Sequence, residues 1–308
     1  MSVATSHTTI LHASVDAGVW AGRTVQSYRV ANQVGEGPSW HPTENRLYWI
    51  DVRRQQLLRL DPSTDAIERW DLPEVVGALG LCRGSEVCLA LTRTLVKFNV
   101  MTAEMATFAT INEEPVGNRL NDGKVSPSGR WFVFGSMDDR MPKSPTGALY
   151  RVSVEGEVLR LHAGLTVCNG IAWNLQANQL YFSDSAKGIL YRAPWNDVSG
   201  QIGEVEVFAT LDKAQGRPDG GAVDLSDQYW SAGVSAGCIN VLDSTGTHIE
   251  KIALPCRAPT MCAFGGDQGD DLYVTSLIRP QWDVPGDHDG ALLRIPLGVP
   301  GPTSPLFG

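Results

Sequence analysis

Short apolar runs recur along the chain, each bounded by small or polar residues that mark turns. Most are rich in aromatic and β-branched residues, which favour strands over helices. The runs occupy residues 47–51, 87–91, 131–136, 180–184, 229–233 and 272–276. Their spacing of roughly 40 to 50 residues is the repeat length of a propeller blade.

A further strand is predicted after each run, and turn residues such as those at 42–45 and 127–129 precede most runs. These strands are predicted at 56–61, 94–99, 148–152, 188–192, 238–243 and 291–295. No amphipathic helix separates the copies, so the strands must pair antiparallel. Six such sheets arranged radially leave only short exposed edges. A β-sandwich is the alternative, but six copies at one period do not suit it.

The chain is therefore predicted to be an all-β protein with one six-bladed β-propeller domain over residues 1–308. Residues 1–23 are expected to form an N-terminal extension, and residues 24–30 to pair with the last sheet. Apolar residues make up 43% of the 308 residues and charged residues 19%, an ordinary globular balance. A core of this size needs no disulfide staples.

The six cysteines include no CxxC pair, and their neighbours are mostly apolar or small. We expect buried free thiols in a reducing compartment. Residues 1–21 resemble neither a secretory signal nor a membrane anchor. A cytoplasmic location is the simplest interpretation.

The net charge of −9 and pI of about 5.1 argue against nucleic acid or an anionic membrane as a partner. They are compatible with a cation site and with a neutral small-molecule substrate. No HExxH motif occurs in the sequence. The sequence leaves the oligomeric state open.

Four polar segments lie about ten residues upstream of their apolar runs. They are GEGPSW at 35–40, NRLNDGK at 118–124, CNGIAW at 168–173 and RPDGGAV at 217–223. Equivalent positions in successive blades face the same mouth of the central channel. The four segments are therefore expected to meet there.

These motifs, one per blade and in this order, resemble those of the regucalcin/gluconolactonase family, also called the senescence-marker-protein family. The resemblance extends from Gly35 to about Pro296 and includes residues 265–276, which look like that family's last blade. It implies a six-bladed propeller that binds one divalent cation in its channel.

The resemblance also implies roles for particular residues. Glu36, Asn169 and Asp219 match the family's metal ligands. Arg119 and Asn121 match residues that line the substrate pocket. A further family acid corresponds to Asp139, where the family often has Glu, so the shorter side chain at this position bears on sugar preference.

Two carboxylates and an amide carbonyl are hard oxygen ligands, which suit Ca²⁺ first and also Mg²⁺ or Mn²⁺, with Zn²⁺ possible if waters complete its shell. The metal would polarise a lactone carbonyl while Asp219 accepts a proton from the attacking water. Arg119, Asn121 and Asp139 would hold sugar hydroxyls. The prediction is a metal-dependent lactonase of carbohydrate metabolism that converts a sugar lactone into its aldonic acid.

Most of these residues also have a simpler structural interpretation. Glu36, Asn169 and Asp219 also fit ordinary turns, and Asp122 before Gly123 is interpreted as one. Arg119 also fits a surface cation, and Asp139 a solvated loop acid. The rival functions are an esterase or organophosphate hydrolase that uses the same metal, and a non-catalytic propeller that binds Ca²⁺.

Overall fold

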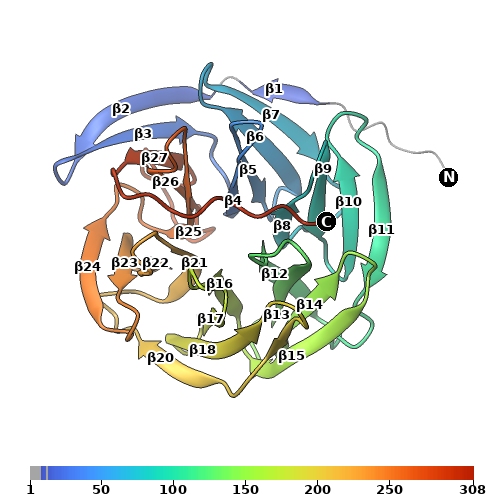
Figure 1. Cartoon of the computed structure of the whole chain (residues 1–308). Coiled ribbons are helices and arrows are strands. Elements are labelled where there is room, and N and C mark those ends of the chain that lie inside the picture. The colour runs from blue at the N-terminus through green and yellow to red at the C-terminus, as the bar shows by residue number, and fades with distance from the viewer. Residues whose placement is uncertain (1–7, 12) are drawn as a thin grey trace.

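A computed structural model describes residues 8–11 and 13–308 of the chain. The strands form six antiparallel sheets arranged around a central axis, which confirms the predicted six-bladed β-propeller (Figure 1). The part of residues 1–23 that precedes residue 8, together with residue 12, lies outside the described residues.

The first three blades contain four or five strands each, in order from the axis outwards. Blade 1 contains β4 (Gly35–His41), β5 (Arg46–Asp51), β6 (Gln56–Asp61), β7 (Ala66–Asp71) and β1 (Thr9–Leu11). Blade 2 contains β8 (Ala78–Leu81), β9 (Glu86–Ala90), β10 (Thr94–Asn99) and β11 (Met105–Thr110). Blade 3 contains β12 (Asn118–Val125), β13 (Trp131–Asp138), β14 (Gly147–Ser153) and β15 (Val158–Leu165).

The second half of the ring follows the same plan. Blade 4 contains β16 (Cys168–Trp173), β17 (Gln179–Asp184), β18 (Ile189–Asn196), β20 (Glu206–Thr210) and the short β19 (Gln201–Ile202). Blade 5 contains β21 (Pro218–Val223), β22 (Tyr229–Gly233), β23 (Cys238–Leu242) and β24 (His248–Ala253). Blade 6 contains β25 (Pro259–Gly265), β26 (Asp271–Ser276), β27 (Leu292–Pro296), β3 (Arg23–Arg29) and β2 (Ser14–Trp20).

The repeated apolar runs are the second strand of each blade, β5, β9, β13, β17, β22 and β26. These runs therefore lie one strand away from the channel. The innermost strands are β4, β8, β12, β16, β21 and β25, which pack against one another around the axis (Figure 1). Four of them are the polar motif segments themselves. Glycine and short polar residues interrupt the apolar pattern of these segments, so the sequence does not mark them as strands.

The ring is closed by the N-terminal part of the chain. Strand β3 pairs antiparallel with β27, with Tyr28 opposite Leu292, which confirms the predicted pairing of residues 24–30 with the last sheet. Strand β2 then pairs with β3 along its whole length, and β1 pairs with β7 of blade 1. The N-terminal strands thus complete blade 6, which also holds the last strands of the chain, and close the ring against blade 1.

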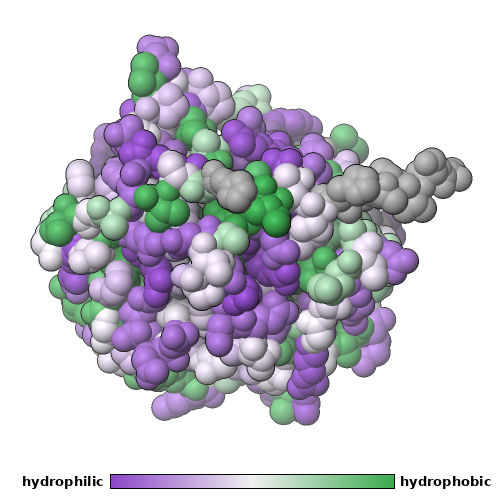
Figure 2. Space-filling model, turned by 90° about the horizontal axis from the view of Figure 1, so that it is seen from above, coloured by the Kyte–Doolittle hydropathy of each residue, from purple (hydrophilic) through white to green (hydrophobic). Residues whose placement is uncertain are grey.

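The core consists of apolar layers between neighbouring blades. Trp49 and Trp70 are fully buried, and so are aromatic residues in the other interblade layers. All six cysteines are free and buried, as predicted. Polar residues cover most of the rim seen in Figure 2, where apolar groups form scattered patches. The described part of the chain contains no helix long and apolar enough to cross a membrane.

The segment after β27, residues 297–308, crosses one face of the propeller over the channel (Figure 1). We call it the C-terminal strap. Leu225 N donates to Pro300 O at 2.9 Å on blade 5, and Phe307 N donates to Leu81 O at 2.7 Å on blade 2. The Phe307 side chain is 1% exposed and packs in the layer between blades 2 and 3. The strap therefore connects opposite sides of the ring.

Candidate active site

Irregular pairing at the start of the innermost strands directs polar side chains to one mouth of the channel. The register of β4 shifts between Glu36 and Ser39, that of β12 between Asn121 and Gly123, and that of β16 between Asn169 and Ala172. Strand β21 shifts in the same way between Pro218 and Gly221. Such bulges re-aim side chains next to active sites.

One of these bulges requires glycine. Gly170 has a φ of +67°, in the left-handed region, and a β-carbon there would lie 2.6 Å from the Tyr229 hydroxyl oxygen. That hydroxyl donates to Gly170 O at 2.7 Å. The backbone that follows Asn169 therefore has a conformation that only glycine adopts without strain.

The predicted substrate and metal residues form one hydrogen-bonded chain. Arg119 Nη1 donates to Asn121 Oδ1 at 2.7 Å, and Asn121 Nδ2 donates to Asn169 Oδ1 at 2.6 Å. Asn169 Nδ2 in turn donates to Asp219 Oδ1, also at 2.6 Å. The structure therefore brings together residues of blades 3, 4 and 5 that are up to 100 positions apart in the sequence.

Asp139 joins this chain from the end of β13. Its Oδ1 accepts from Arg119 Nε at 3.1 Å, and its two oxygens accept from Arg53 Nη1 and Nη2 at 2.8 and 2.5 Å. Burial raises the pKa of Asp139, but the two arginines outweigh burial and hold it below its usual value. Asp139 is therefore not a solvated loop acid, and Arg119, which is 7% exposed, is not a surface cation.

Sequence reasoning missed Arg53. It follows β5 of blade 1 by two residues, so it lies at the same mouth as Asp139, which directly follows β13 of blade 3. The sequence signal for Arg53 was its position just after the second strand of a blade. Arginine is so common in surface turns that this position did not mark it as a site residue.

Three carboxylates lie close enough to influence one another at the centre of this mouth. Burial, then Asp219 and Asp122, raise the pKa of Glu36 well above its usual value. Burial and then Asp122 raise the pKa of Asp219 to about 7, against the lowering effect of Arg217, Arg279 and Arg119. Like charges placed together in a desolvated site favour a bound proton or a bound cation.

Asp122 was interpreted as a turn residue, which was wrong. It lies inside β12 with a φ of +28° and is 5% exposed. Its Oδ2 accepts from Ile171 N at 3.2 Å, whereas its buried Oδ1 has no hydrogen-bond partner within the described residues. Asp122 therefore adds a third buried acid that the sequence reasoning did not assign to the site.

The donor set fits a hard divalent cation. Over residues 8–11 and 13–308, no group of three or more His, Cys, Asp and Glu side chains is arranged to hold a metal by itself. The predicted set includes an amide oxygen, and Asn169 Oδ1 keeps a second lone pair beside the one that Asn121 uses. The unpartnered Asp122 Oδ1 and the mutual effect of Glu36 and Asp219 both favour a positive ion among these oxygens.

The chain matches a known protein family over most of its length. Residues 34–278 match the family model described as the SMP-30/gluconolactonase/LRE-like region. This match covers well over half of the chain and all four polar motifs. The chain belongs to the SMP-30/gluconolactonase/LRE-like family.

Several members of the SMP-30/gluconolactonase/LRE-like family align with most of the chain. 6-Deoxy-6-sulfogluconolactonase of Pseudomonas putida is 32% identical over 290 residues, which are 91% of this chain and 96% of that protein. Pentonolactonase XacC of Haloferax volcanii is 30% identical over 277 residues, 87% and 92% of the two chains. The structure of regucalcin from Agrobacterium tumefaciens, described as a calcium-binding protein, superposes with a TM-score of 0.85 at 26% identity and covers 91% of this chain and 95% of that one.

Asp139→Ala is expected to raise the KM for the lactone about tenfold while changing kcat only a few-fold. The substitution leaves Arg53 and Arg119 without their shared carboxylate, and it would remove the acceptor that the family resemblance assigns to substrate hydroxyls. Initial-rate kinetics on the best lactone measure both constants. Asp139→Glu is the control, because it keeps the charge and is expected to retain most of kcat/KM. A loss confined to kcat would contradict a substrate-binding role.

Proposed function

We propose that this protein hydrolyses a sugar lactone to its aldonic acid with the help of one divalent cation held by Glu36, Asn169 and Asp219. The lactonase class itself is confirmed by the family and by its two lactonase-named relatives. One observation supports the proposed cation site: oxygen-bearing side chains from three blades lie together at one channel mouth. Asn169 and Asp219 are hydrogen-bonded there, and Asp219 raises the pKa of Glu36.

Asp219 is proposed as the general base. The water oxygen attacks the lactone carbonyl carbon as its proton passes to the Asp219 carboxylate. The carbonyl carbon–ring oxygen bond then breaks, and the ring oxygen takes the proton back to become a hydroxyl. A carboxylate beside the attacking water can take up this proton and return it within one turnover.

Asn169 fixes the position of this base. Its Nδ2 donates to Asp219 Oδ1 at 2.6 Å and to Ser185 Oγ at 2.7 Å. One carboxylate oxygen of Asp219 is thereby engaged, which leaves the other to face the water. When bound, the cation would supply Lewis-acid polarisation of the carbonyl, and oxygen ligands favour Ca²⁺ over Mg²⁺, Mn²⁺ or Zn²⁺.

Arg119, Asn121 and Asp139 are proposed to orient the sugar. Arg119 already bridges the other two by hydrogen bonds, so their positions are set before substrate binds. Arg53 fixes Asp139 from blade 1. Directional donors and acceptors of this kind suit a neutral polyhydroxylated ring.

The cellular location and the metabolic role of the enzyme also belong to the proposal. Six free, buried thiols suit a reducing, cytoplasmic compartment. A sugar-oxidising reaction would supply the lactone, and the chain would act as one propeller domain without nucleic acid or membrane partners.

The proposal is tested by acid release from gluconolactone, xylonolactone, arabinolactone and galactonolactone before and after treatment with a chelator. We expect hydrolysis of at least one lactone, loss of roughly 90% or more of the rate in chelator, and recovery on adding Ca²⁺, Mg²⁺, Mn²⁺ or Zn²⁺. Spontaneous hydrolysis is subtracted with a protein-free sample. Absent or metal-independent acid release on every lactone would favour a non-catalytic Ca²⁺-binding propeller. Metal-dependent turnover of aryl esters or organophosphates alone would favour the other hydrolase.

A further inference from the structure

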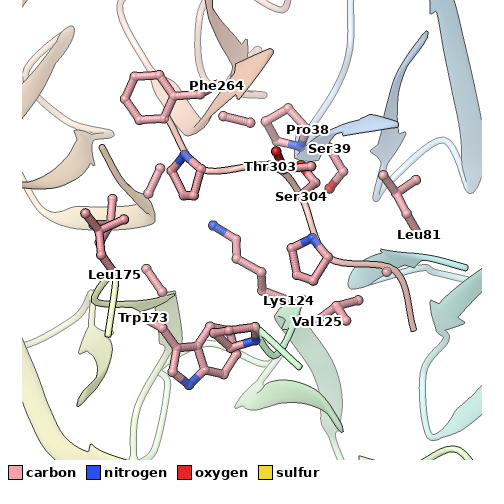
Figure 3. Close-up of a pocket in the computed structure, with 18 of the residues that line it drawn as sticks. Pro38, Ser39, Leu81, Lys124, Val125, Trp173, Leu175, Phe264, Thr303 and Ser304 are labelled. Carbon is pink, nitrogen blue, oxygen red and sulfur yellow. The ribbon is translucent and has the colours of Figure 1, made fainter. Parts of the chain in front are cut away.

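A pocket lies at the end of the channel opposite the acidic centre. Glu36, Asn169 and Asp219 lie at the first residues of their strands, whereas this pocket is lined by the last residues of the same innermost strands and by the C-terminal strap (Figure 3). Its volume is about 210 Å³. Among its apolar lining residues are Leu79, Leu81, Val125, Trp173, Leu175 and Phe264. We call it the strap pocket.

Lys124 is the one ionisable residue among the described residues that line the strap pocket. Figure 3 shows its ammonium group extending into the middle of the space, below the strap residues Thr303 and Ser304. The bulge at Asp122 sets this direction, because the extra residue in β12 changes the alternation of side chains between Asn121 and Gly123.

The ammonium group of Lys124 is incompletely paired. Its Nζ donates one hydrogen bond, to Gly221 O at 2.5 Å, and takes part in no ion pair within the described part of the chain. An ammonium group has three donors. Burial lowers the pKa of Lys124, and the charge of Asp122 raises it by a smaller amount. A desolvated cation facing apolar walls is stabilised by an anion that enters the pocket.

We infer that the strap pocket binds a small monocarboxylate with an apolar, ring-sized body, whose carboxylate accepts a hydrogen bond from Lys124 Nζ. The single ammonium group of Lys124 matches a ligand that carries a single negative charge. Leucine, valine and aromatic walls suit a hydrocarbon body and disfavour the hydroxyls of an aldonic acid. An apolar cavity of about 150 Å³ accommodates benzene, so about 210 Å³ accommodates a six-membered ring that carries a carboxylate.

The strap supplies the lid of this site. Pro302, Thr303, Ser304 and Pro305 form its outer wall. The strap is fixed on the far side by Phe307, whose N donates to Leu81 O, and by Gly308, whose N donates to Gly129 O at 3.0 Å. This site is independent of the proposed lactonase activity, because it uses none of the residues assigned to hydrolysis.

Binding of 4-fluorobenzoate to the full-length protein, followed by ¹⁹F NMR and by the fluorescence of Trp173 and the other tryptophans, tests this inference. We expect saturable binding, with the neutral isostere 4-fluorobenzamide and the Lys124→Met variant each weaker by roughly tenfold or more. Lys213→Met, which removes an exposed lysine outside the pocket, is the matched control and is expected to bind like the unaltered protein.

A second variant keeps the test decisive if Lys124→Met does not fold. Ser304→Trp places an indole in the pocket from the strap, leaves Lys124 intact and is expected to abolish binding. No saturable binding to the unaltered protein, or undiminished binding to Ser304→Trp, would overturn the inference. So would undiminished binding in a folded Lys124→Met, and loss of that binding in Arg119→Met would place the carboxylate at the opposite mouth.

Discussion

Asp219→Ala should lower kcat for lactone hydrolysis by on the order of a thousandfold or more, because the change removes the proposed base and a cation ligand together. The Asp219 side chain is 8% exposed and is hydrogen-bonded to Asn169, so a water cannot readily reproduce its position. The fold should persist, since Asp219 contributes no apolar packing to the interblade layers. Steady-state kinetics and metal content measured on the same sample test both effects.

The control for this variant is Asp267→Ala. Asp267 is exposed and follows the end of β25, away from the mouth where Asp219 lies. It should keep normal turnover and normal metal content. Near-normal turnover in Asp219→Ala, with a circular dichroism spectrum like that of the unaltered protein, would show that the ligand and base assignment is wrong.

The metal-free protein should lose stability as the pH rises from about 4 to about 7. The pKa of the Asp219 carboxyl is raised in the folded protein from 3.8 to about 7, so the folded state holds a proton that the unfolded state has already released. Stability from this group is complete below the unfolded pKa and is lost as the pH passes the folded pKa. The shift corresponds to on the order of 4 kcal/mol, and Glu36 acts in the same direction.

A bound cation takes the place of that proton, so the gain in Tm on adding Ca²⁺ or Mn²⁺ should grow across this pH range. Thermal melts in chelator and in metal, from about pH 5 to about pH 8, measure the difference. Asp219→Ala should flatten both the pH dependence and the metal effect. Equal pH dependence with and without metal, in the unaltered protein, would contradict a cation site at these carboxylates.

Periodicity was enough to predict the blade count, because each blade repeats an apolar strand that must be buried between neighbours. Leu47–Asp51 and its counterparts are continuous apolar runs for that reason. Periodicity did not identify the innermost strands, because glycine, alanine and short polar residues interrupt the apolar pattern of β16 and β21. A buried strand with one face on a narrow polar channel carries little hydrophobic signal.

The site was predicted to the extent that its residues belong to recognisable motifs. Glu36, Arg119, Asn121, Asn169 and Asp219 all lie at one mouth, in the positions that the motif order implied. Asp122 was missed because Asp-Gly is a common turn signal, and only the pairing of β12 with β13 reveals a bulge there. Arg53 was missed because its partner Asp139 lies 86 residues away, a pairing that depends on the tertiary fold.

Anomalous diffraction from crystals grown with Mn²⁺ tests the arrangement of the three ligands most directly. A single strong peak is expected at one channel mouth, roughly 2 to 2.6 Å from oxygens of Glu36, Asn169 and Asp219 together. A peak bound elsewhere, or one that reaches only one of the two carboxylates while the other points away from it, would contradict a shared cation.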